Sequence, residues 1–367
     1  MAGLNMKRVG NLYSNIDINY IFNIYKQVRS NTKNKYKIYK FDSFLSINVY
    51  RIYRTFKNCN YIPKGYNIFL IKEPKYRIVM SQNIYDKVIN HVMGNLLIKA
   101  LDSSLINTNV ATRKDKGTHY GLKYLKKYLN ELKGGEVYAL KFDISKYFYS
   151  INHEILMEEV RKKIKDKRFL DVLFKIINST DRGVNERIEK LKKQEISKLD
   201  NIDKINEVKR IPIYKKGYGL PIGNLTSQIM AIYYLNYLDH YIKEKLKIKH
   251  YIRYMDDGVL LCNDKSYLRY CLKEIERIVS LYDLKLNDKT KIINVNKEGL
   301  DFLGFRFYII NNRIIMKLRS SVKRNFKKKM KLIKKNKINC PVNVVASYKG
   351  QLKYGNCYNL LTNNLVK

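Results

Sequence analysis

The spacing of apolar residues along the chain predicts a mixture of helices and short strands. Val88, Val92, Leu96 and Leu97 recur at helical intervals and form one apolar stripe. The same kind of reasoning predicts further helices, from the N-terminus onward, at 16–29, 41–56, 84–100, 120–132, 229–246 and 268–282. Six helices of ordinary length indicate a globular chain with a substantial helical layer.

Short apolar runs bounded by turn residues predict strands between these helices. Residues 67–71 and 76–80 read as a hairpin joined by a tight connection at 72–75. A second hairpin is predicted from 250–253 and 258–262, and a further strand pair begins at 300–305. Hairpins imply antiparallel pairing of these strands.

Three carboxylates follow or interrupt these strands. Asp143 ends the apolar run 137–142, and Tyr254-Met255-Asp256-Asp257 lies at the tip of the second hairpin. Each piece has an ordinary alternative, because Asp favours turns and also caps helices. Together, however, three carboxylates at strand ends can hold two Mg²⁺ ions, which prefer oxygen ligands and leave positions open for substrate phosphates. Such a site suits nucleotidyl transfer.

The charge balance points to a nucleic acid as partner. The 367 residues include 73 Lys and Arg against 32 Asp and Glu, a formal net charge of +41. A polyanion offsets such self-repulsion. An AT-rich genome also favours Lys, which explains many lysines but not their excess over acids.

Other features of the sequence exclude several classes of protein. Hydrophobic residues make up 45% of the chain, which excludes a disordered protein. No run of 18 apolar residues and no signal peptide at residues 1–20 are recognisable, so no membrane partner is expected. Five scattered cysteines without a CxxC spacing indicate a reduced, cytoplasmic protein without a zinc site.

Four further segments are candidates for binding. The basic loop 111–119 opens onto a helix, where free N–H groups suit a phosphate. The Gly/Pro turn 219–228 permits close approach of a ligand. Near the C-terminus, Val322, Phe326, Met330 and Ile333 form one apolar face of a helix whose other faces are cationic, which suits a duplex backbone. The charged stretch 181–217 predicts one or two exposed helices, an excursion on the surface or else a partner site.

Taken together, these pieces resemble a reverse transcriptase. The resemblance runs from about 61 to 359 and is strongest at Phe142-Asp143 with Phe148, at 219–228, at 254–257 and at Leu303-Gly304-Phe305. It implies a right-hand polymerase, an α+β fold with fingers, a palm of antiparallel sheet plus helices, and a helical thumb. The implied division is an N-terminal extension and fingers at 1–135, a palm with an interleaved fingers segment at 136–310, and a thumb at 311–367.

The resemblance also implies roles for single residues. Asp143, Asp256 and Asp257 would be catalytic and would bind two Mg²⁺ ions, with Mn²⁺ as the alternative ion, and Ile144 would join them as a metal ligand. The implied contacts to the incoming nucleotide are Arg77, Arg113, Phe148, Pro221, Ile222, Gly223 and Lys289. The implied contacts to template and primer are Tyr254, Met255, Lys323, Arg324, Lys327 and Lys328. Phe148 would match the gate that excludes ribonucleotides, a role for which Tyr147 competes.

The implied function is copying of a template RNA into cDNA from dNTPs, in a bacterial or phage-encoded enzyme. The form Ile222-Gly223-Asn224 with Ser227-Gln228 is most similar to diversity-generating retroelements, whose enzymes make errors at adenines and work with a small basic accessory protein. An amide at position 222 could hydrogen-bond near the nascent pair, whereas Ile222 cannot, so discrimination should loosen. The charged stretch 181–217 departs from that subgroup.

Several alternatives remain open at this stage. An anti-phage defence enzyme and a group II intron-like reverse transcriptase share the same catalytic motifs. A non-catalytic RNA-binding protein with a polymerase fold belongs to another class, although all three acids are present. An RNA-dependent RNA polymerase is disfavoured by the bulk of Phe148.

Overall fold

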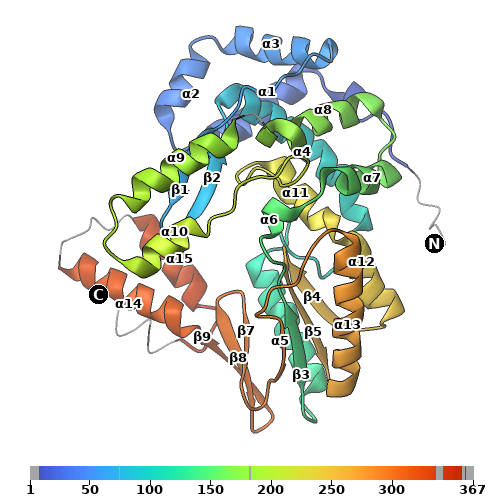
Figure 1. The fold of residues 1–367 in the computed structure, drawn as a ribbon, viewed down its shortest axis with the longest axis vertical. Helices are drawn as coiled ribbons and strands as arrows, with labels where there is room; N and C mark the ends of the chain where they lie inside the picture. The colour runs from blue at the N-terminus through green and yellow to red at the C-terminus, as the bar shows by residue number, and fades with distance from the viewer. Residues whose placement is uncertain (1–7, 74, 182, 336–341, 358–359, 361–367) are drawn as a thin grey trace. The chain divides into compact units, whose positions relative to one another are not determined.

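The computed structural model describes residues 8–73, 75–181, 183–335, 342–357 and 360 (Figure 1). Pro74, in the expected connection 72–75, lies outside the described residues. The chain forms two compact units, each assembled from segments that are distant in the sequence. Unit 1 comprises Met1–Ile106, Ile144–Leu238 and Ile278–Lys285, and unit 2 comprises Asn107–Asp143, Asp239–Arg277 and Leu286–Lys367. The division into fingers, palm and thumb at 135 and 310 follows different boundaries and stays a prediction.

Unit 1 is mostly helical, with one hairpin. The strands of the hairpin, β1 (Asn67–Ile71) and β2 (Arg77–Ser81), pair antiparallel as predicted. The α-helices wholly within unit 1 are α1 (Ile18–Asn31), α2 (Lys35–Asp42), α3 (Leu45–Lys57), α4 (Ile84–Leu101), α6 (Tyr147–Ser150), α7 (His153–Lys163), α8 (Lys167–Ile177), α9 (Val184–Ile196), α10 (Ile202–Lys209) and α11 (Leu225–Tyr234). Among them, α4 packs against α1 and α11, and the side chain of Asn83 caps the start of α4 by accepting from the N–H of Asp86.

Two of the predicted helices are interrupted. The predicted helix 41–56 is confirmed from Leu45 onward, as α3, but its start is wrong, because Phe41 and Asp42 belong to α2. Phe44, between them, has φ −131° and ψ 40°, outside the helical region. The Asp42 carboxylate accepts hydrogen bonds from Tyr25 and Arg29 of α1, so α2 is tied to α1 at its last residue. The predicted helix 229–246 is divided into α11, α12 (Asn236–His240) and a π-helical turn (Tyr241–Lys245).

The charged stretch 181–217 is not a solvated excursion. It forms two helices, α9 and α10, as the sequence predicts, but one face of each is buried against the β1–β2 hairpin. Val184, Ile188 and Val208 form a single core with Ile78 and Met80 of β2. The expectation of a surface excursion is therefore wrong, because a few well-placed apolar residues are enough to dock a helix whose other faces are charged.

Unit 2 is built around antiparallel sheets. Its four-stranded sheet has the order β4-β5-β3-β6, formed by β3 (Tyr138–Phe142), β4 (His250–Tyr254), β5 (Asp257–Cys262) and β6 (Lys291–Asn294). A second sheet has the order β7-β8-β9, formed by β7 (Leu300–Phe302), β8 (Phe305–Ile310) and β9 (Arg313–Leu318). The helices that fall largely or wholly here are α5 (Thr118–Leu132), α13 (Lys265–Leu281), α14 (Ser320–Lys334) and α15 (Val342–Leu352).

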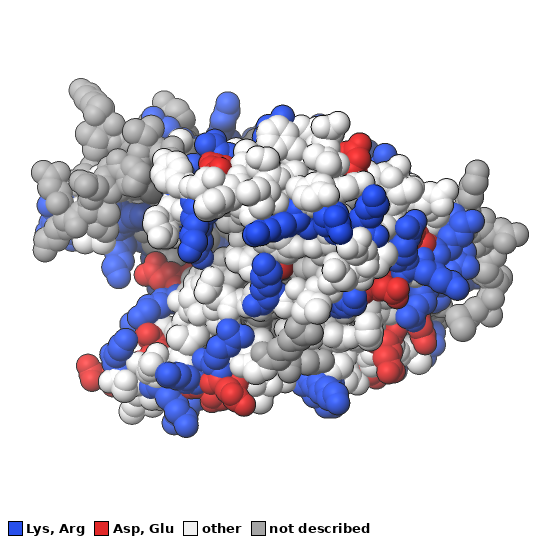
Figure 2. All heavy atoms as spheres, turned by 90° about the horizontal axis from the view of Figure 1, so that it is seen from above, with Lys and Arg blue, Asp and Glu red and all other residues white. Residues whose placement is uncertain are grey.

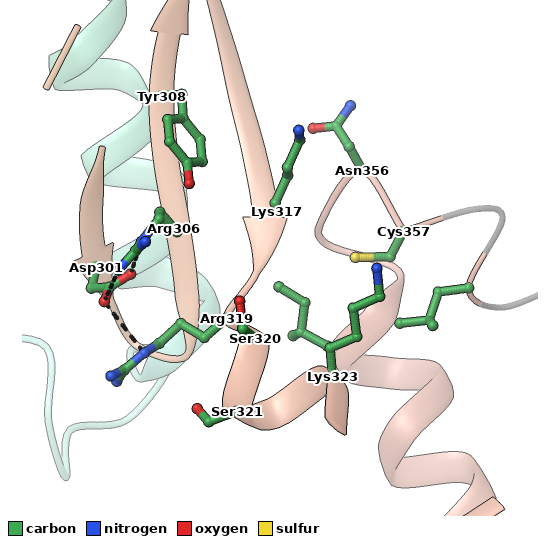
Figure 3. Close-up of a pocket in the computed structure, with 12 residues that line it drawn as sticks. Asp301, Arg306, Tyr308, Lys317, Arg319, Ser320, Ser321, Lys323, Asn356 and Cys357 are labelled. Atoms are coloured by element: carbon green, nitrogen blue, oxygen red, sulfur yellow. Dashed lines mark hydrogen bonds and ion pairs between the residues drawn. The ribbon is translucent and has the colours of Figure 1, made fainter. Parts of the chain in front are cut away.

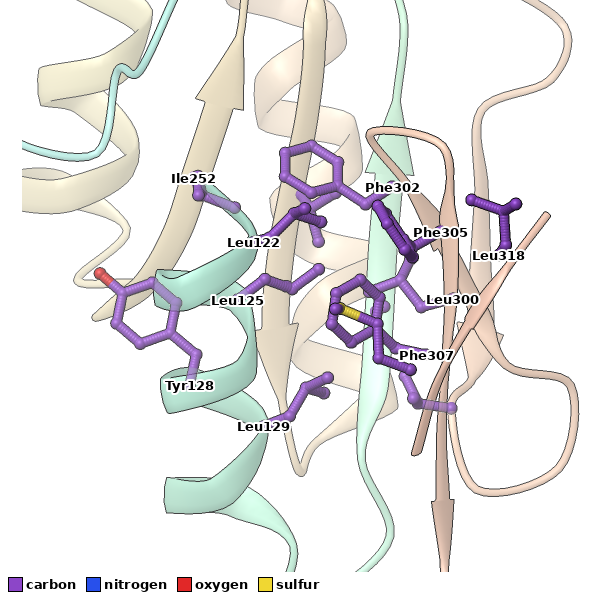
Figure 4. Close-up of a cluster of buried hydrophobic side chains, with 14 of the residues drawn as sticks. Leu122, Leu125, Tyr128, Leu129, Ile252, Leu300, Phe302, Phe305, Phe307 and Leu318 are labelled. Carbon is purple, nitrogen blue, oxygen red and sulfur yellow. The ribbon is translucent and has the colours of Figure 1, made fainter. Parts of the chain in front are cut away.

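One hydrophobic core joins the two sheets of unit 2 to α5. Leu122, Leu125 and Leu129 point from α5 toward Ile252 of β4 and Phe307 of β8 (Figure 4). Phe326 and Met330 of α14 are buried in the same core, which confirms the predicted apolar face of that helix. The α+β class with antiparallel sheets is thereby confirmed. Among the described residues, the helices are too short or too polar to cross a bilayer.

Candidate active site

The three predicted carboxylates come together at one edge of the four-stranded sheet. β3 and β5 pair antiparallel, with Phe142 opposite Gly258, so Asp143 leaves β3 beside the start of β5. Asp257 is the first residue of β5 and pairs with Tyr254, which leaves Met255 and Asp256 as the two-residue turn of the hairpin. The register of adjacent strands therefore places all three acids within unit 2 at the same strand ends.

The tip of the hairpin is shaped by two backbone constraints. Met255 has φ 55°, the left-handed conformation that a two-residue hairpin turn requires. Gly258 lies against the Phe142 ring, and a Cβ there would come within 2.2 Å of it. Any larger residue would push the hairpin away from β3, so Gly258 permits the close approach that brings Asp256 and Asp257 to Asp143.

Burial and mutual repulsion act on the two acids of the hairpin. Burial, followed by the negative charge of Asp143, raises the pKa of Asp256 to about 7. Burial also raises the pKa of Asp257 to about 6, although Lys141 opposes this shift. The Lys141 ammonium lies 3.3 Å from Asp257 Oδ2 and also donates to the carbonyl of Asp301, at 2.9 Å. Negative charge in this site is thus only partly balanced by the chain itself.

The donor set fits a divalent cation. Asp257 Oδ1 is buried and has no hydrogen-bond partner among the described residues, and carboxylate oxygens are the ligands that Mg²⁺ prefers. The side chains are not preassembled, however, since no group of three or more His, Cys, Asp or Glu in the described part of the chain is arranged to hold a metal. The other oxygen of the Asp257 carboxylate, Oδ2, is engaged by Lys141.

A buried charge network, which the sequence did not predict, holds the turn of the β4–β5 hairpin. Arg253 is fully buried, and its guanidinium donates to both carboxylate oxygens of Asp239 at 2.7 and 2.6 Å. The same guanidinium donates to the carbonyl of Met255, in the turn itself. Tyr251 also donates to Asp239, at 2.8 Å. The only sign of this network in the sequence is that Arg253 directly precedes Tyr254.

In unit 1 the structure distinguishes between the two candidates for the gate. Tyr147 is 2% exposed, and its hydroxyl donates to the carbonyl of Ala231, so its ring belongs to the core. Phe148 is half-buried and keeps part of its ring accessible. Of the two aromatic side chains, only that of Phe148 is accessible to a ligand, which favours the prediction that it is the gate.

The turn 219–228 connects Phe148 to the β1–β2 hairpin. The N–H of Leu220 donates to the carbonyl of Phe148 at 2.7 Å, and the N–H of Met80 donates to that of Ile222 at 2.8 Å. Gly223 has φ 127°, and a Cβ there would lie 2.3 Å from the Met80 carbonyl oxygen. Phe148, Pro221-Ile222-Gly223 and the strand that begins at Arg77 are therefore assembled in one unit.

Other predicted nucleotide contacts lie in unit 2. The N–H of Asn287 donates to the carbonyl of Asp143 at 2.7 Å, and Lys289, two residues after Asn287, is exposed. Arg113 is half-buried and donates to the carbonyl of Asn109. The basic loop does open onto α5, and His119 stacks on Tyr354 with ring centroids 3.7 Å apart, which fits a structural rather than a catalytic histidine.

The predicted template and primer contacts are on the surface of unit 2. Tyr254 and Met255 are half-buried at the hairpin. The predicted contacts on α14 are exposed cations: Lys323, Arg324, Lys327 and Lys328. A groove of about 690 Å³ runs beside the start of α14 (Figure 3). On its wall, Asp301 is paired with Arg306 at 2.6 Å and with Arg319 at 3.5 Å.

The remaining predicted metal ligand, Ile144, belongs to unit 1 and is 2% exposed.

Comparisons with known proteins identify the family. Residues 62–307 match the family described as reverse transcriptase (RNA-dependent DNA polymerase), and the chain belongs to this family. The protein YkfC of Escherichia coli is 24% identical over 284 residues, which cover 67% of this chain and 65% of YkfC. A putative COX1/OXI3 intron 1 protein of Saccharomyces cerevisiae is 21% identical over 180 residues, 48% of this chain and 18% of that protein. The chain thus spans less than two thirds of each of these relatives.

Solved structures give a weaker likeness. An apo telomerase of Candida tropicalis, truncated of its C-terminal domain, aligns with a TM-score of 0.46 at 14% identity, covering 68% of this chain and 54% of that one. A Candida albicans telomerase in complex with a fragment of telomeric RNA also aligns with a TM-score of 0.46, at 13% identity, covering 75% of this chain and 52% of that one.

Proposed function

We propose that this chain is an RNA-directed DNA polymerase that extends a primer on a template RNA with dNTPs. The observation that carries the proposal is the meeting of Asp143, Asp256 and Asp257 at one edge of the sheet, with negative charge that Lys141 only partly balances. Membership of the reverse transcriptase family supports the same reaction. Cationic surfaces that suit a nucleic acid accompany the site, on a chain of net charge +41.

In this proposal the three carboxylates and the carbonyl of Ile144 hold two Mg²⁺ ions. When bound, the ions activate the primer 3′-hydroxyl and neutralise charge on the triphosphate and the departing pyrophosphate. The chain's own part is to fix the ligands: Gly258 permits the close approach of β5 to β3, and Arg253 holds the carbonyl of Met255. Rigid placement of acidic ligands on strands limits the reorganisation needed during the reaction.

Each unit, taken by itself, carries residues that we propose contact the incoming nucleotide. Phe148 would lie against the sugar and exclude a 2′-hydroxyl, while Pro221-Ile222-Gly223 would face the nascent pair. Arg77, Arg113 and Lys289 would contact the phosphates. The hairpin residues Tyr254 and Met255 and the cations of α14 would contact the primer and template, because exposed Lys and Arg on one helix suit a phosphate backbone.

Primer extension on a defined RNA template with Mg²⁺ tests this function. Asp256→Ala should abolish DNA synthesis, a loss of roughly a thousandfold or more for removal of a metal ligand. Asp288→Ala is the matched control, because Asp288 is an exposed acid outside the carboxylate cluster and its loss should leave synthesis near wild type. Near-wild-type extension by Asp256→Ala would contradict the proposal, and salt-sensitive RNA binding without synthesis by the wild type would favour a non-catalytic RNA-binding protein.

Within this function we propose error-prone copying of the kind made by diversity-generating retroelements, with a small basic accessory protein as partner. Ile222 supports the proposal: its side chain is half-buried at the turn and offers no hydrogen bond to a nascent pair. Sequencing of the cDNA decides the matter. Errors concentrated opposite template adenines would support it. Accurate cDNA would instead favour a defence or intron-like enzyme, and the name of the yeast intron 1 protein agrees with the intron-like alternative.

A further inference from the structure

The helices α2 and α3 expose large apolar side chains that the catalytic proposal does not use. Five of them follow one another along α2, the joining turn and α3, and we call them the α2–α3 surface: Tyr36, Tyr39, Phe44, Ile47 and Tyr50. Tyr36 is 75% exposed, and Tyr39 and Phe44 are each 61% exposed. The segment precedes residues 62–307, the part that matches the family.

The spacing of these residues places them on continuous faces. Tyr36 and Tyr39 are three apart on α2, while Phe44, Ile47 and Tyr50 are three apart along α3 from its N-cap, so each set shares one side of its helix. The opposite sides of the helices already supply the core, with Ile38 and Phe41 buried on α2, and Val49, Ile52 and Phe56 buried on α3. The exposed apolar side chains are thus additional to those that fold this layer.

The charges around the α2–α3 surface are almost all positive. Between residues 18 and 57 the sequence has six Lys and three Arg but a single acid, Asp42, which is already paired with Arg29. In the view from above (Figure 2), more Lys and Arg than Asp and Glu side chains are visible, and uncharged residues lie between them. An excess of this kind attracts a polyanion and repels another basic surface.

Cations also lie beside aromatic rings on α3. The Arg54 guanidinium carbon is 6.0 Å from the centroid of the Tyr50 ring, and Nη1 is 3.4 Å from its hydroxyl. Lys57 lies 6.0 Å from the ring of Tyr53, whose centroid is 6.4 Å from that of Tyr50. Exposed rings with a cation beside them combine a stacking platform with a phosphate contact, the combination found in proteins that bind single-stranded nucleic acids.

We propose that the α2–α3 surface binds single-stranded RNA, with unpaired bases stacked on its aromatic rings and the backbone on Arg51, Arg54 and Lys40. Unpaired bases are required because a duplex does not offer base faces to a ring. The core of a protein interface is depleted in charged residues, whereas cations are interleaved with the rings here. The surface would hold a stretch of RNA in addition to the template at the catalytic acids, and its binding does not depend on DNA synthesis.

Binding of a fluorescent single-stranded RNA to the full chain, measured in EDTA without dNTPs, tests the proposal. The triple variant Tyr36→Ala/Tyr39→Ala/Phe44→Ala should weaken binding at least about tenfold, since stacking platforms lose affinity when truncated to alanine. Arg51→Ala/Arg54→Ala should lower the slope of log affinity against log salt by about 0.7 for each phosphate that the variant no longer neutralises. RNA carrying 4-thiouridine should crosslink to residues 35–57 of the wild type.

Controls separate stacking from unfolding and from other RNA contacts. Tyr36→Phe/Tyr39→Phe keeps the rings and should bind like the wild type, and Tyr270→Ala removes a 52% exposed tyrosine of α13 and should change nothing. Thermal unfolding of each variant checks the fold. Unchanged affinity of the triple variant for single-stranded RNA, with no crosslink at 35–57, would overturn the proposal. A triple variant that loses as much affinity for duplex RNA or for anionic vesicles as for single-stranded RNA would also overturn it. Absence of DNA synthesis would affect only the catalytic proposal, because these readouts need none.

Discussion

The ammonium group of Lys141 lies 3.3 Å from Oδ2 of Asp257, within the cluster of three acids. Lys141 is on β3, two residues before Asp143, and its side chain also reaches the carbonyl of Asp301 on β7. The lysine therefore ties the acid site to the second sheet of unit 2. Its ammonium group also places one positive charge beside the carboxylates that we propose as metal ligands.

Lys141→Met should tighten the binding of divalent cations, and the gain in affinity should be larger at high pH than at low pH. Lys141 lowers the pKa of Asp257 against the effect of burial, so its removal should raise that pKa. Above about pH 8, where the acids are ionised, loss of a competing cation should tighten Mg²⁺ binding severalfold. Near pH 6 the gain should be smaller, because protons compete better for a carboxylate whose pKa has been raised. Thermal stabilisation by Mg²⁺, titrated at both pH values, measures the affinity without reference to activity.

The matched control for this experiment is Lys291→Met. Lys291 lies opposite Lys141 in the β3–β6 ladder and is exposed, with no ion pair among the described residues. The substitution Lys291→Met removes the same charge from the neighbouring strand, whereas the contact between Lys141 and Asp257 is kept. If both variants bind Mg²⁺ alike at both pH values, the contact between Lys141 and Asp257 has no part in metal binding.

The acid cluster should make the metal-free protein less stable as the pH rises. Burial and Asp143 raise the pKa of Asp256 to about 7, above its value in the unfolded chain, so the folded state binds more protons between about pH 4 and 7. The stabilising contribution is present below the unfolded pKa and is lost as pH rises through 7. Asp256→Asn should accordingly stabilise the metal-free protein at pH 8, by on the order of 2 kcal/mol, and should give little gain at pH 4.

Urea unfolding in EDTA at the two pH values measures this difference. Asp288→Asn, which removes an exposed acid from unit 2, supplies the comparison. An equal gain at pH 4 and pH 8 for Asp256→Asn would mean that the effect is not electrostatic.

The fold and the acid site were predictable from the sequence where the signal is local. Short apolar runs on both sides of Asp256-Asp257 fixed the hairpin, and a strand ending in Asp143 fixed the third acid. The pairing of β3 with β5 came from the family resemblance. Their register, and with it the contact of Lys141 with Asp257, depends on the close fit of Gly258 to Phe142, which no periodicity encodes.

Features that depend on tertiary packing were not predictable. Arg253 and Asp239 are 14 residues apart, and nothing in either segment indicates that both are fully buried and paired. In α9 the apolar stripe is thin, and its burial becomes evident only once β2 lies against Ile188. Tyr147 and Phe148 have similar side chains, and only the fold shows which of them enters the core.

Breaking the buried pair should destabilise unit 2 strongly. Arg253→Met would leave the Asp239 carboxylate buried without its guanidinium, at a cost of about 3 to 5 kcal/mol. Arg253→Lys keeps the charge but loses the paired, two-point hydrogen bonding of the guanidinium to Asp239, so a smaller loss of stability than for Arg253→Met is expected. Urea unfolding measures both. The surface pair of Arg277 with Glu274 offers a contrast, since Arg277→Met should cost less than about 1 kcal/mol. Equal losses at the two arginines would contradict a structural role for the buried pair.

Phe148→Ala should let the enzyme use ribonucleotides. Its partly accessible ring, on a segment whose carbonyl is fixed by Leu220, is the proposed barrier to a 2′-hydroxyl, and removing it takes away the clash. We expect the ratio of kcat/KM for dNTP to that for rNTP to fall by about a hundredfold, comparable to the discrimination that shape alone provides. Tyr147→Phe is the informative control, because it removes only the hydroxyl that donates to Ala231. This control should lose about 1 kcal/mol of stability and keep its preference for dNTPs. A change of sugar preference in Tyr147→Phe but not in Phe148→Ala would reassign the gate to the neighbouring residue.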